Sequence, residues 1–349
     1  GAGAGGLGPG ARAGRGRAVK QAVLTAPGAF ELVDAPVPEM GPDDLLVRVA
    51  ACGVCASELD MYTGHTDRAF PILPGHEVSG VVEKAGAAVT RQRPGDRVGI
   101  WVTEAGFSEY VRVHTDFALP AGDMPLELAL AEPVACAVNA VEIADVGLGD
   151  DVVIVGAGFM GALVLKLVLL KGPRRVFVAD TRTEALERAR AIGATHTIDV
   201  RAESLVDVVR ANTDRVPAGT FGDVDEHDEV GADVSFEVTG VQAPLGDVGN
   251  ATRMAGTVVI VGYHQGGTRE IPLGNWNWKA LRVVNAHFRE VATIMRGMRT
   301  GMRLLTSGRL DVGDLVTHRF GLDEVGDAFQ IAVDKPAGFL KSTVIIGGE

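Results

Sequence analysis

The stretch Cys52-Gly-Val-Cys55 holds two of the three cysteines of this 349-residue chain, the third being Cys136. A C-x-x-C pair is compatible with a redox dithiol, with half of a structural zinc site, or with one metal ligand beside a bystander. Three cysteines are too few for a four-cysteine zinc site. A redox pair usually opens a helix in a thioredoxin-like unit, whereas this pair precedes ASELDMYTG in a strand-rich region. The pattern therefore favours a single metal ligand.

Further candidate ligands follow Cys55 along the chain. His76 and Glu77 lie in LPGHEVSGVV, and Glu132 lies with Cys136 in AEPVACAVNA. A thiolate, an imidazole and a carboxylate from three separate segments suit a catalytic zinc ion, which keeps one coordination position open. We therefore expect one catalytic zinc held by Cys55, His76 and a glutamate. The pattern leaves open whether Glu77 or Glu132 is the ligand at rest.

A second chemical motif is Gly-x-Gly-x-x-Gly, formed by Gly156, Gly158 and Gly161 between a hydrophobic strand and a hydrophobic helix. The first glycine permits a tight turn, the second lets the backbone approach a pyrophosphate, and the third lets helix and strand pack closely. The start of the helix offers N–H donors and a favourable dipole to the phosphates. The same pattern within residues 1–6 lies in a low-complexity tail and is a chance match.

Asp180 ends the next predicted strand, where its carboxylate can accept both hydroxyls of the adenosine ribose. The same charge would repel the extra phosphate of NADP, so NAD is the expected cofactor. Arg182 qualifies this expectation, because an arginine at this place can bind a 2′-phosphate. The residues expected to contact the cofactor are Gly156, Gly158, Phe159, Met160, Gly161, Asp180, Arg182, Thr239 and Val261.

Two kinds of structure are needed to position these residues. Residues 20–123 contain short Val/Leu/Ile runs separated by Gly and Pro, which predicts a β-rich domain, and residues 126–144 are predicted to form a helix. From residue 151 onward strands and helices alternate, which predicts a doubly wound parallel sheet of the Rossmann type. The last 60 or so residues, with a helix over 295–310, are expected to return to the first domain. The expected limits are a flexible tail at 1–18, a catalytic domain at 19–137 and 290–349, and a nucleotide-binding domain at 138–289.

Composition restricts the function further. The net charge of −12 argues against a nucleic-acid or anionic-membrane partner, which would require a basic surface. With three cysteines the chain has no disulfide framework, which predicts a reducing, cytoplasmic location. The apolar run at 152–170 contains Lys166 and a glycine cluster, so a strand, a turn and a helix explain it better than a membrane span. The acidic stretch at 221–230 is expected to be a hydrated loop.

Several motifs in series carry a family resemblance. GVCASELDMYTG, LPGHEVSGVVEKAG, RPGDRV, GFSEYV, EPVACAVNAV and VIVGAGFMG resemble the successive motifs of the medium-chain, zinc-dependent alcohol and polyol dehydrogenases, over about residues 20–349. The resemblance implies a GroES-like catalytic domain joined to a Rossmann domain. It places zinc ligands at Cys55, His76 and Glu132, a neighbouring glutamate at Glu77, and the proton-relay hydroxyl at Ser57. Cys52 and Cys136 are then packing residues.

The chain departs from the family pattern in three ways. Relatives with a structural zinc carry a four-cysteine segment where only residues 99–105 stand here, so no structural zinc is expected. Many relatives have a histidine, completing the proton relay, at the position of Asp60. Either Asp60 takes that role or the proton leaves by another route. Glu58 replaces the more usual aspartate after Ser57, and the sequence assigns it no role.

The resemblance also suggests a substrate class. NAHFRE corresponds to the segment where polyol dehydrogenases place a polar contact, which implicates Arg289 and Glu290, and Tyr62 and Asn139 are candidates for further hydroxyl contacts. Polar pocket groups favour a polyhydroxylated substrate, because leaving each unpaired costs about 1–3 kcal/mol. We expect Ser57, Glu77 and Asp60 to act in catalysis, with hydride transfer between NAD and a secondary alcohol of a polyol, sugar or cyclitol. Relatives are dimers or tetramers, so a homo-dimer or homo-tetramer is expected by analogy.

Three alternative functions share part of this pattern. A zinc-free enone or quinone reductase that uses NAD(P)H shares the fold, but the set Cys55, His76 and Glu132 argues against it. A non-catalytic dinucleotide-binding protein is disfavoured by the same ligands together with Ser57. A thiol oxidoreductase predicts that Cys52→Ser abolishes activity, whereas the zinc hypothesis predicts a mild effect for Cys52→Ser and complete loss for Cys55→Ser.

Overall fold

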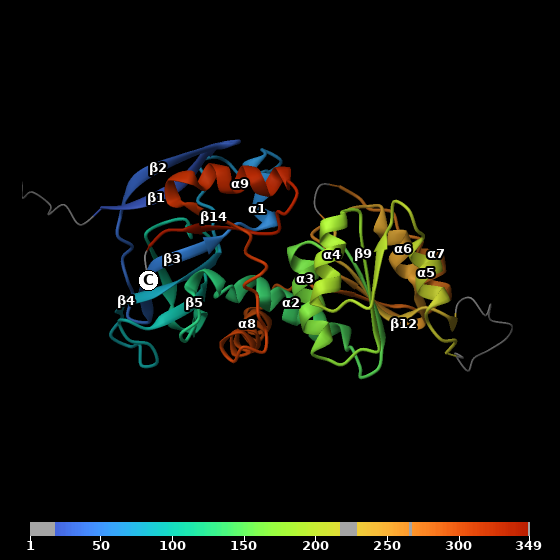
Figure 1. Ribbon diagram of the computed structural model, residues 1–349. Coiled ribbons are helices and arrows are strands. Elements are labelled where there is room, and N and C mark those ends of the chain that lie inside the picture. Colours follow the sequence, from blue (N-terminus) through green and yellow to red (C-terminus); the bar gives the residue numbers. More distant parts are fainter. Residues whose placement is uncertain (1–17, 217–228, 265–266, 348–349) are drawn as a thin grey trace, which may run out of the picture.

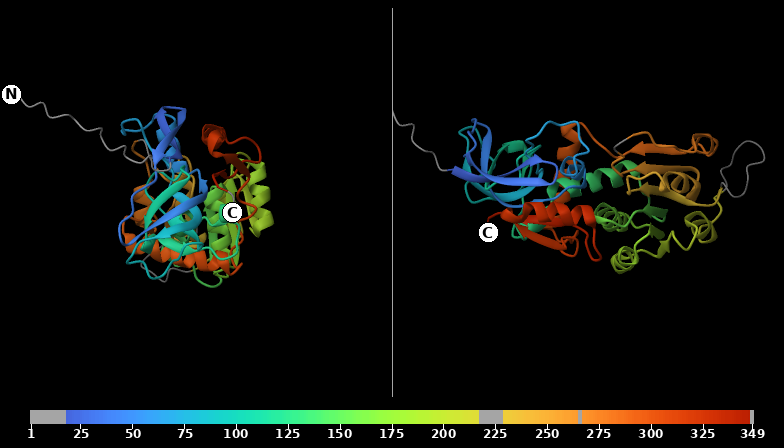
Figure 2. Two further views of the ribbon diagram at one scale, coloured as in Figure 1. Left: turned by 90° about the vertical axis from the view of Figure 1, so that its left-hand side faces the viewer. Right: turned by 90° about the horizontal axis from the view of Figure 1, so that it is seen from above.

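The computed structural model describes residues 18–216, 229–264 and 267–347. Figure 1 and the view from above in Figure 2 show two lobes side by side, a β-rich lobe and a lobe built on a parallel sheet. The predicted tail at 1–18 lies outside the described residues except for Ala18, which already belongs to the first strand. The acidic stretch at 221–230 lies outside them too, apart from its last two residues.

The β-rich lobe combines residues from both ends of the chain. A hairpin of β1 (Ala18–Ala26) and β2 (Ala29–Pro36) flanks a seven-stranded sheet. Two neighbouring strands at one edge of this sheet, β14 (His318–Gly321) and β15 (Ser342–Ile345), come from the C-terminal part of the chain. Val344 in the last strand lies opposite Cys52, so the C-terminal segment runs beside the cysteine pair. The other strands of the sheet are β3 (Asp44–Gly53), β4 (Glu77–Ala85), β5 (Arg97–Trp101), β6 (Tyr110–His114) and β7 (Ala118–Pro120).

Helices pack against the apolar side chains of this sheet and form a core with them. Apolar residues of β3 share a core with Phe329 of α9 (Val325–Asp334), whose ring contacts those of Phe30, Tyr62 and Phe107. The short helix α1 (Ala56–Tyr62) packs against α9 and begins directly after Cys55. The strand rich in valine and leucine thus places the cysteine pair at the edge of a well-packed core.

The second lobe confirms the predicted Rossmann architecture. Six parallel strands are arranged in the order β10-β9-β8-β11-β12-β13. In β8, Val152 and Ile154 face one apolar core and Val153 and Val155 face the other, which explains the unbroken run of apolar residues. The strands are β8 (Asp151–Val155), β9 (Arg175–Asp180), β10 (His196–Asp199), β11 (Ala232–Glu237), β12 (Thr252–Ile260) and β13 (Arg282–Asn285).

Helices cover both faces of the parallel sheet (Figure 1). On one face lie α3 (Phe159–Leu169) and α4 (Thr183–Ile192). On the other lie α5 (Leu205–Ala211), α6 (Pro244–Ala251) and α7 (Leu273–Trp278). The run at 152–170 is therefore a strand, a turn and a helix, and among the described residues no helix combines the length and apolarity that crossing a membrane requires.

The helix α2 (Ala131–Ala144) runs between the lobes, and α8 (Val291–Thr306) packs against it beneath the β-rich lobe. A Cβ on Gly297 would lie 2.9 Å from the carbonyl oxygen of Ala135, so this glycine lets the two helices approach closely. The single helix predicted over 126–144 is wrong at its start, because residues Leu126–Leu128 form a separate 3-10 turn. Pro133 explains the later start: it lacks an N–H and is tolerated only in the first turn of a helix.

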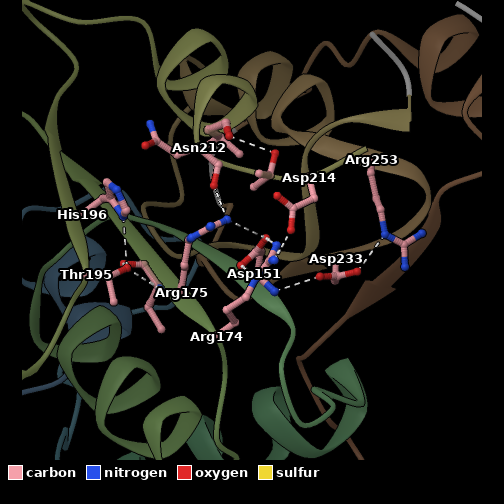
Figure 3. A network of polar contacts seen from close by, with 12 residues as sticks. Asp151, Arg174, Arg175, Thr195, His196, Asn212, Asp214, Asp233 and Arg253 are labelled. Carbon is pink, nitrogen blue, oxygen red and sulfur yellow. Dashed lines mark hydrogen bonds and ion pairs between the residues drawn. The ribbon is translucent and has the colours of Figure 1, made fainter. Parts of the chain in front are cut away.

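A network of paired charges lies at the amino ends of the parallel strands (Figure 3). The buried carboxylate of Asp151, at the start of β8, accepts hydrogen bonds from Arg174 Nε (3.0 Å) and Nη2. The backbone N–H of Asp151 donates to Asp233, whose other carboxylate oxygen accepts from Arg253 Nε at 2.7 Å. We call the set Asp151, Arg174, Asp233 and Arg253 the Asp151 network. It fastens the starts of β8, β9, β11 and β12 together.

Candidate metal centre and cofactor cleft

Strand pairing brings the predicted metal ligands together. Gly53 at the end of β3 lies opposite Glu77 at the start of β4. Cys55 follows Gly53 by two residues, and His76 directly precedes Glu77. The Cys55 Sγ, a ring nitrogen of His76 and a carboxylate oxygen of Glu77 all lie within 4.8 Å of one another. Within the described ranges this is the one such group of three His, Cys, Asp or Glu ligand atoms.

The chemistry of this group fits zinc. Thiolate sulfur, imidazole nitrogen and carboxylate oxygen are the donors that zinc uses in proteins. One buried oxygen nearby, Glu58 Oε2, has no hydrogen-bond partner in the described part of the chain. Buried acceptors without a donor are costly, and a bound cation would offset that cost.

Glu58 orients the histidine. Its Oε1 accepts hydrogen bonds from the backbone N–H of Gly75 (2.6 Å) and from His76 Nδ1 (3.0 Å), which leaves Nε2 of the ring for a metal. Burial alone would raise the pKa of Glu58, but the His76 charge and hydrogen bonds outweigh it, and the pKa is lowered. Burial would lower the pKa of His76, yet the charges of Glu58 and Cys55 raise it well above its usual value. Glu58, which the sequence left without a role, is thus the positioning residue for His76.

Lys341 holds the second acidic residue. Its Nζ donates to Glu77 Oε1 at 2.8 Å and to the carbonyl of Val54 at 2.7 Å. It also lies 2.6 Å from Glu77 Oε2, without hydrogen-bond geometry. Burial would lower the pKa of Lys341, but the charges of Glu77 and Cys55 prevail, so its pKa is raised and the ammonium stays protonated. A Cβ at Gly53 would lie 2.1 Å from Glu77 Oε2, so only glycine leaves room for this pair.

Glu132 lies outside the group of three but close to it. On α2, its Oε1 accepts a hydrogen bond from Cys136 Sγ at 3.4 Å. Burial raises the pKa of its carboxyl group, while the charge of His76 acts in the opposite direction. The structure therefore gives two carboxylates at the centre: Glu77 beside the other ligands and held by Lys341, and Glu132 within electrostatic reach of His76.

The remaining thiols and the relay hydroxyl differ in their surroundings. Ser57 Oγ donates to Cys55 Sγ at 3.2 Å, so the predicted relay hydroxyl sits beside the predicted ligand. Cys52 is fully buried, and burial, together with the charges of Glu58 and Glu77, raises its pKa well above the usual value. Such a thiol is a poor nucleophile. Burial likewise raises the pKa of Cys136.

Two predicted substrate residues are engaged elsewhere. The Tyr62 hydroxyl contacts Gln330 Oε1 of α9 at 3.2 Å, and its ring packs on Phe329. The Asn139 amide donates to the carbonyl oxygen of Ala286 at 2.5 Å. These contacts link helices and loops of the fold and favour structural roles for both side chains.

The other three predicted residues are more accessible. Asp60 is half-buried on α1, and in the described ranges its carboxylate has no hydrogen bond or ion pair. Arg289 is exposed and donates to the carbonyl of Phe288 at 2.9 Å. Glu290 is exposed and directly precedes α8 without capping it through its side chain.

The glycine turn is shaped for close approach. Gly156 has φ +103°, and a Cβ there would lie 2.8 Å from Thr239 Cγ2, at the point where β8 and β11 diverge. A Cβ at Gly161 would lie 1.9 Å from the Gly156 carbonyl oxygen, so the helix rests directly on the turn. The ring of Phe159, in the helix that follows this turn, lies 4.7 Å from Lys341 Nζ, so the glycine turn lies close to the candidate metal ligands.

Sequence reasoning missed two residues that order this region. Lys341 lies 264 positions from Glu77, and the only signal for it was a lone cation before an apolar strand. Glu237 ends β11 fully buried. Its Oε1 accepts from the backbone N–H of Thr239 at 2.7 Å and its Oε2 bonds His264 Nε2 at 2.7 Å. Its signal was an acid that ends an apolar strand in FEVTG.

Comparison with known proteins matches the chain to two family models. Residues 41–123 match the alcohol dehydrogenase GroES-like domain, and residues 160–304 match the zinc-binding dehydrogenase family. The chain is 31% identical to sorbitol dehydrogenase of Gallus gallus, over 88% of this chain and 91% of that protein. It is 30% identical to L-threonine 3-dehydrogenase of Ruegeria pomeroyi, over 85% of this chain and 91% of that protein.

A solved structure has the same fold. It is a protein of Sinorhizobium meliloti, described as a zinc-binding dehydrogenase and bound to NADP, that superposes with a TM-score of 0.80 at 28% identity. The match covers 94% of this chain and 99% of that one.

Proposed function

The chain belongs to the zinc-dependent alcohol and polyol dehydrogenases of the medium-chain dehydrogenase/reductase superfamily, and from that premise we propose that it oxidises a secondary alcohol of a polyol, sugar or cyclitol to the ketone with NAD. The convergence of Cys55, His76 and Glu77 within 4.8 Å carries this proposal. A zinc ion bound there would act as a Lewis acid that polarises the substrate oxygen and makes a hydroxyl proton more acidic.

The residues of the chain then have distinct tasks. Ser57, whose hydroxyl lies beside Cys55, receives the hydroxyl proton of the alcohol. Asp60 lies one turn further along α1, on the same face, and passes that proton toward solvent. A nicotinamide cofactor held at the glycine turn would supply the acceptor for the hydrogen on the carbinol carbon, which would leave as hydride with its electron pair. Loss of the proton and of the hydride converts the secondary alcohol into a ketone.

We assign one zinc to the chain and no structural zinc. Cys55 and His76 are its ligands, with Glu77 or Glu132 as the carboxylate. Glu77 is supported by its distance to the other two ligand atoms, and Glu132 by its position in the family motif EP. Glu58 keeps the His76 ring in place, and Lys341 keeps Glu77 in place.

The cofactor cleft is proposed to bind NAD along the carboxyl ends of β8, β9 and β11. The turn at Gly156, Gly158 and Gly161 would hold the pyrophosphate, and Asp180 would hold the adenosine ribose. Phe159, Met160, Thr239 and Val261 line the same cleft in this assignment. Its support is the shape of the turn and the position of Asp180, whose Oδ2 accepts from the Ala157 N–H at 2.7 Å.

The substrate is proposed to carry several polar groups. Sorbitol and L-threonine, which name two of the relatives, both contain a secondary hydroxyl beside further polar groups. Since Tyr62 and Asn139 already have partners in the fold, Arg289 and Glu290 are the more available of the four expected contacts. A zinc-free reductase is less well supported, because it gives no reason for a thiol, an imidazole and a carboxylate to converge.

Three wider assignments belong to the same proposal. The domain limits 19–137 with 290–349, and 138–289, agree with which strands share a sheet, although the boundary at 137/138 falls inside α2. A homo-dimer or homo-tetramer is supported by the edge strand β13, beside which Leu273, Trp278 and Val283 are exposed. A cytoplasmic location is supported by three cysteines that are all free.

The test is NADH formation by the full-length protein against a panel of polyols, sugars, inositols and L-threonine. We expect turnover with at least one secondary alcohol, nearly complete loss in Cys55→Ser, and little change in the matched variant Cys52→Ser. Equal loss in both cysteine variants would support dithiol chemistry instead. Absence of turnover in a zinc-loaded protein, together with reduction of enones by NAD(P)H, would overturn the proposal in favour of the zinc-free reductase.

A further inference from the structure

A buried carboxylate and an imidazole are paired at the carboxyl ends of β11 and β12. Glu237, the last residue of β11, is fully buried, and His264 follows β12. His264 Nε2 lies 2.7 Å from Glu237 Oε2, and the histidine side chain is 14% exposed. An ionised carboxylate only accepts hydrogen bonds, so Nε2 is the donor. Ligands of parallel sheets bind at this edge, and neither residue has a task in the proposed oxidation.

Glu237 joins the loop after β11 (238–243) to the loop after β12 (261–264). Its Oε1 accepts hydrogen bonds from the backbone N–H groups of Thr239 (2.7 Å) and Gly240 (3.0 Å), and from the Thr239 hydroxyl. A carboxylate has about four acceptor sites, and these three donors together with His264 fill them. Its backbone carbonyl oxygen accepts from the first two residues of the loop after β12, at 2.8 and 2.9 Å.

The two loops and the glycine turn pack directly on one another. A Cβ on Gly262 would lie 2.2 Å from the backbone nitrogen of Gly240. A Cβ on Gly156, in the turn proposed to hold the pyrophosphate, would lie 2.8 Å from Thr239 Cγ2. These contacts leave no free space, and closely packed segments transmit displacements to one another. A shift of Thr239 or Gly240 therefore changes the wall of the cofactor cleft.

The loop after β12 is anchored on both sides by consecutive residues. On the outside, the ring of Tyr263 stacks on that of His287, which follows β13, with the ring centroids 4.9 Å apart. On the inside, His264 donates to Glu237. The loop is thus fixed between the strands on its two sides, and the inner anchor is the buried one.

The inner anchor depends on a single polar contact. His264 Nδ1 is buried and has no hydrogen-bond partner among the residues that the structure describes, so the bond from Nε2 is the polar contact that fixes the ring. Without the imidazole, Glu237 Oε2 would be a buried acceptor that lacks a donor, which is costly. Rotation of the carboxylate toward another donor would release Thr239 and Gly240 from Oε1.

We propose that His264 is a positioning residue of the cofactor cleft. Through its hydrogen bond to Glu237 it holds the loops after β11 and β12 against the glycine turn, and it thereby sets the affinity for the dinucleotide. The inference rests on the proposed dinucleotide function of this cleft. It assigns a part in cofactor binding to an imidazole that is not a candidate metal ligand.

The test is NADH binding to the full-length protein, followed by the fluorescence of the nicotinamide in the absence of an alcohol. In His264→Ala the dissociation constant should rise about tenfold or more, because a hydrogen bond to a buried charged group is lost. In His264→Gln, which keeps an N–H donor of similar reach, it should stay within about threefold of the wild type. Zinc content should be the same in all three proteins, since no candidate metal ligand is changed.

His114→Ala is the matched control. His114 also lies beside a carboxylate, 3.6 Å from Asp116, but on the surface of the other lobe. Its replacement should leave the NADH dissociation constant at the wild-type value. If His264→Ala does not fold, His264→Asn takes its place with the same expectation, because the shorter side chain does not reach Glu237.

The outcomes separate positioning from a purely structural role. An unchanged NADH dissociation constant in folded His264→Ala, even with a lower unfolding temperature, would overturn the inference alone. Equal weakening in His264→Ala and His264→Gln would also overturn it, because the hydrogen-bond donor would then not matter. Failure of the wild type to bind NADH would instead contradict the proposed dinucleotide function, and the inference would fall with it.

Discussion

The two lobes each contain a cluster of charged side chains, and the clusters differ in how their charges are paired. In the Asp151 network each carboxylate has a guanidinium partner: Arg174 for the buried Asp151 and Arg253 for the half-buried Asp233 (Figure 3). At the metal centre the ligand atoms of Cys55, His76 and Glu77 face one another.

The metal centre also leaves one buried acceptor without a donor. Glu58 Oε2 has no hydrogen bond within the described ranges, whereas Glu77 Oε2 lies 2.6 Å from Lys341 Nζ. A paired cluster is what stability requires, whereas converging acceptors are favourable only with a cation present. The difference in pairing separates a charged cluster that stabilises the fold from one that suits a bound cation.

The largest expected effect is that of metal removal. When a chelator removes zinc, the dehydrogenase activity should fall more than about a hundredfold, and it should return when zinc is added. In the proposed mechanism zinc is the group that polarises the substrate oxygen, and none of the ligand residues can replace it. The variant Asp151→Ala should show the same ratio between its zinc-loaded and chelated forms. Activity that survives complete zinc removal would contradict a catalytic role for the candidate metal centre.

Loss of a charge from the Asp151 network should instead lower stability. Breaking a buried ion pair costs about 3–5 kcal/mol, and because Arg174 is 41% exposed, solvent screening reduces the expected loss for Asp151→Ala to about 2–3 kcal/mol. Urea unfolding would measure it. Asp314→Ala removes the exposed pair with Lys166 and should cost less than about 1 kcal/mol. Equal losses in the two variants would show that the network adds no stability beyond a surface pair.

The histidine-positioning contact should affect metal affinity more than folding. Glu58→Gln keeps the size of the side chain but removes the charge that faces His76, so zinc affinity should fall about 10- to 100-fold. Competition with a chromogenic chelator would measure it, with the exposed Glu83→Gln as control. Unchanged zinc affinity would remove Glu58 from the site.

The smallest effect is expected at the second cysteine. Cys52 is fully buried in the apolar core, and its thiol donates to the Gly53 carbonyl at 3.7 Å. Cys52→Ser should therefore cost about 1 kcal/mol of stability and leave zinc content and kcat unchanged. A fall in kcat comparable to that of Cys55→Ser would revive the dithiol alternative.

What the sequence predicts depends on how far apart the interacting residues lie in the chain. The glycine turn at Gly156–Gly161 and the acid at Asp180 are parts of one strand-turn-helix-strand unit, so their spacing alone indicates the cofactor cleft. The candidate ligands Cys55 and His76 were predicted from residue type and a family pattern. The alternation of strands and helices likewise predicted the Rossmann sheet correctly.

Other features depend on distant contacts that no local pattern contains. Lys341 reaches Glu77 across 264 positions because β15 pairs with β3, and that pairing is not visible in either segment. The hydrogen bond from Arg182 to Asp180 depends on the side-chain rotamers of both residues, which the sequence does not specify. The sequence therefore indicated only that Asp180 favours NAD and that Arg182 can favour NADP. Tyr62 was expected in the substrate pocket, but its hydroxyl contacts α9, which follows it by more than 260 residues.

The most direct test of the central claim is the zinc content of the full-length protein, purified with zinc present and measured by plasma mass spectrometry beside Cys55→Ser. The account predicts close to one zinc per chain in the wild type and almost none in Cys55→Ser, with both proteins folded. No zinc in the folded wild type, or equal zinc in the two proteins, would contradict the claim that Cys55, His76 and a glutamate form a catalytic metal centre.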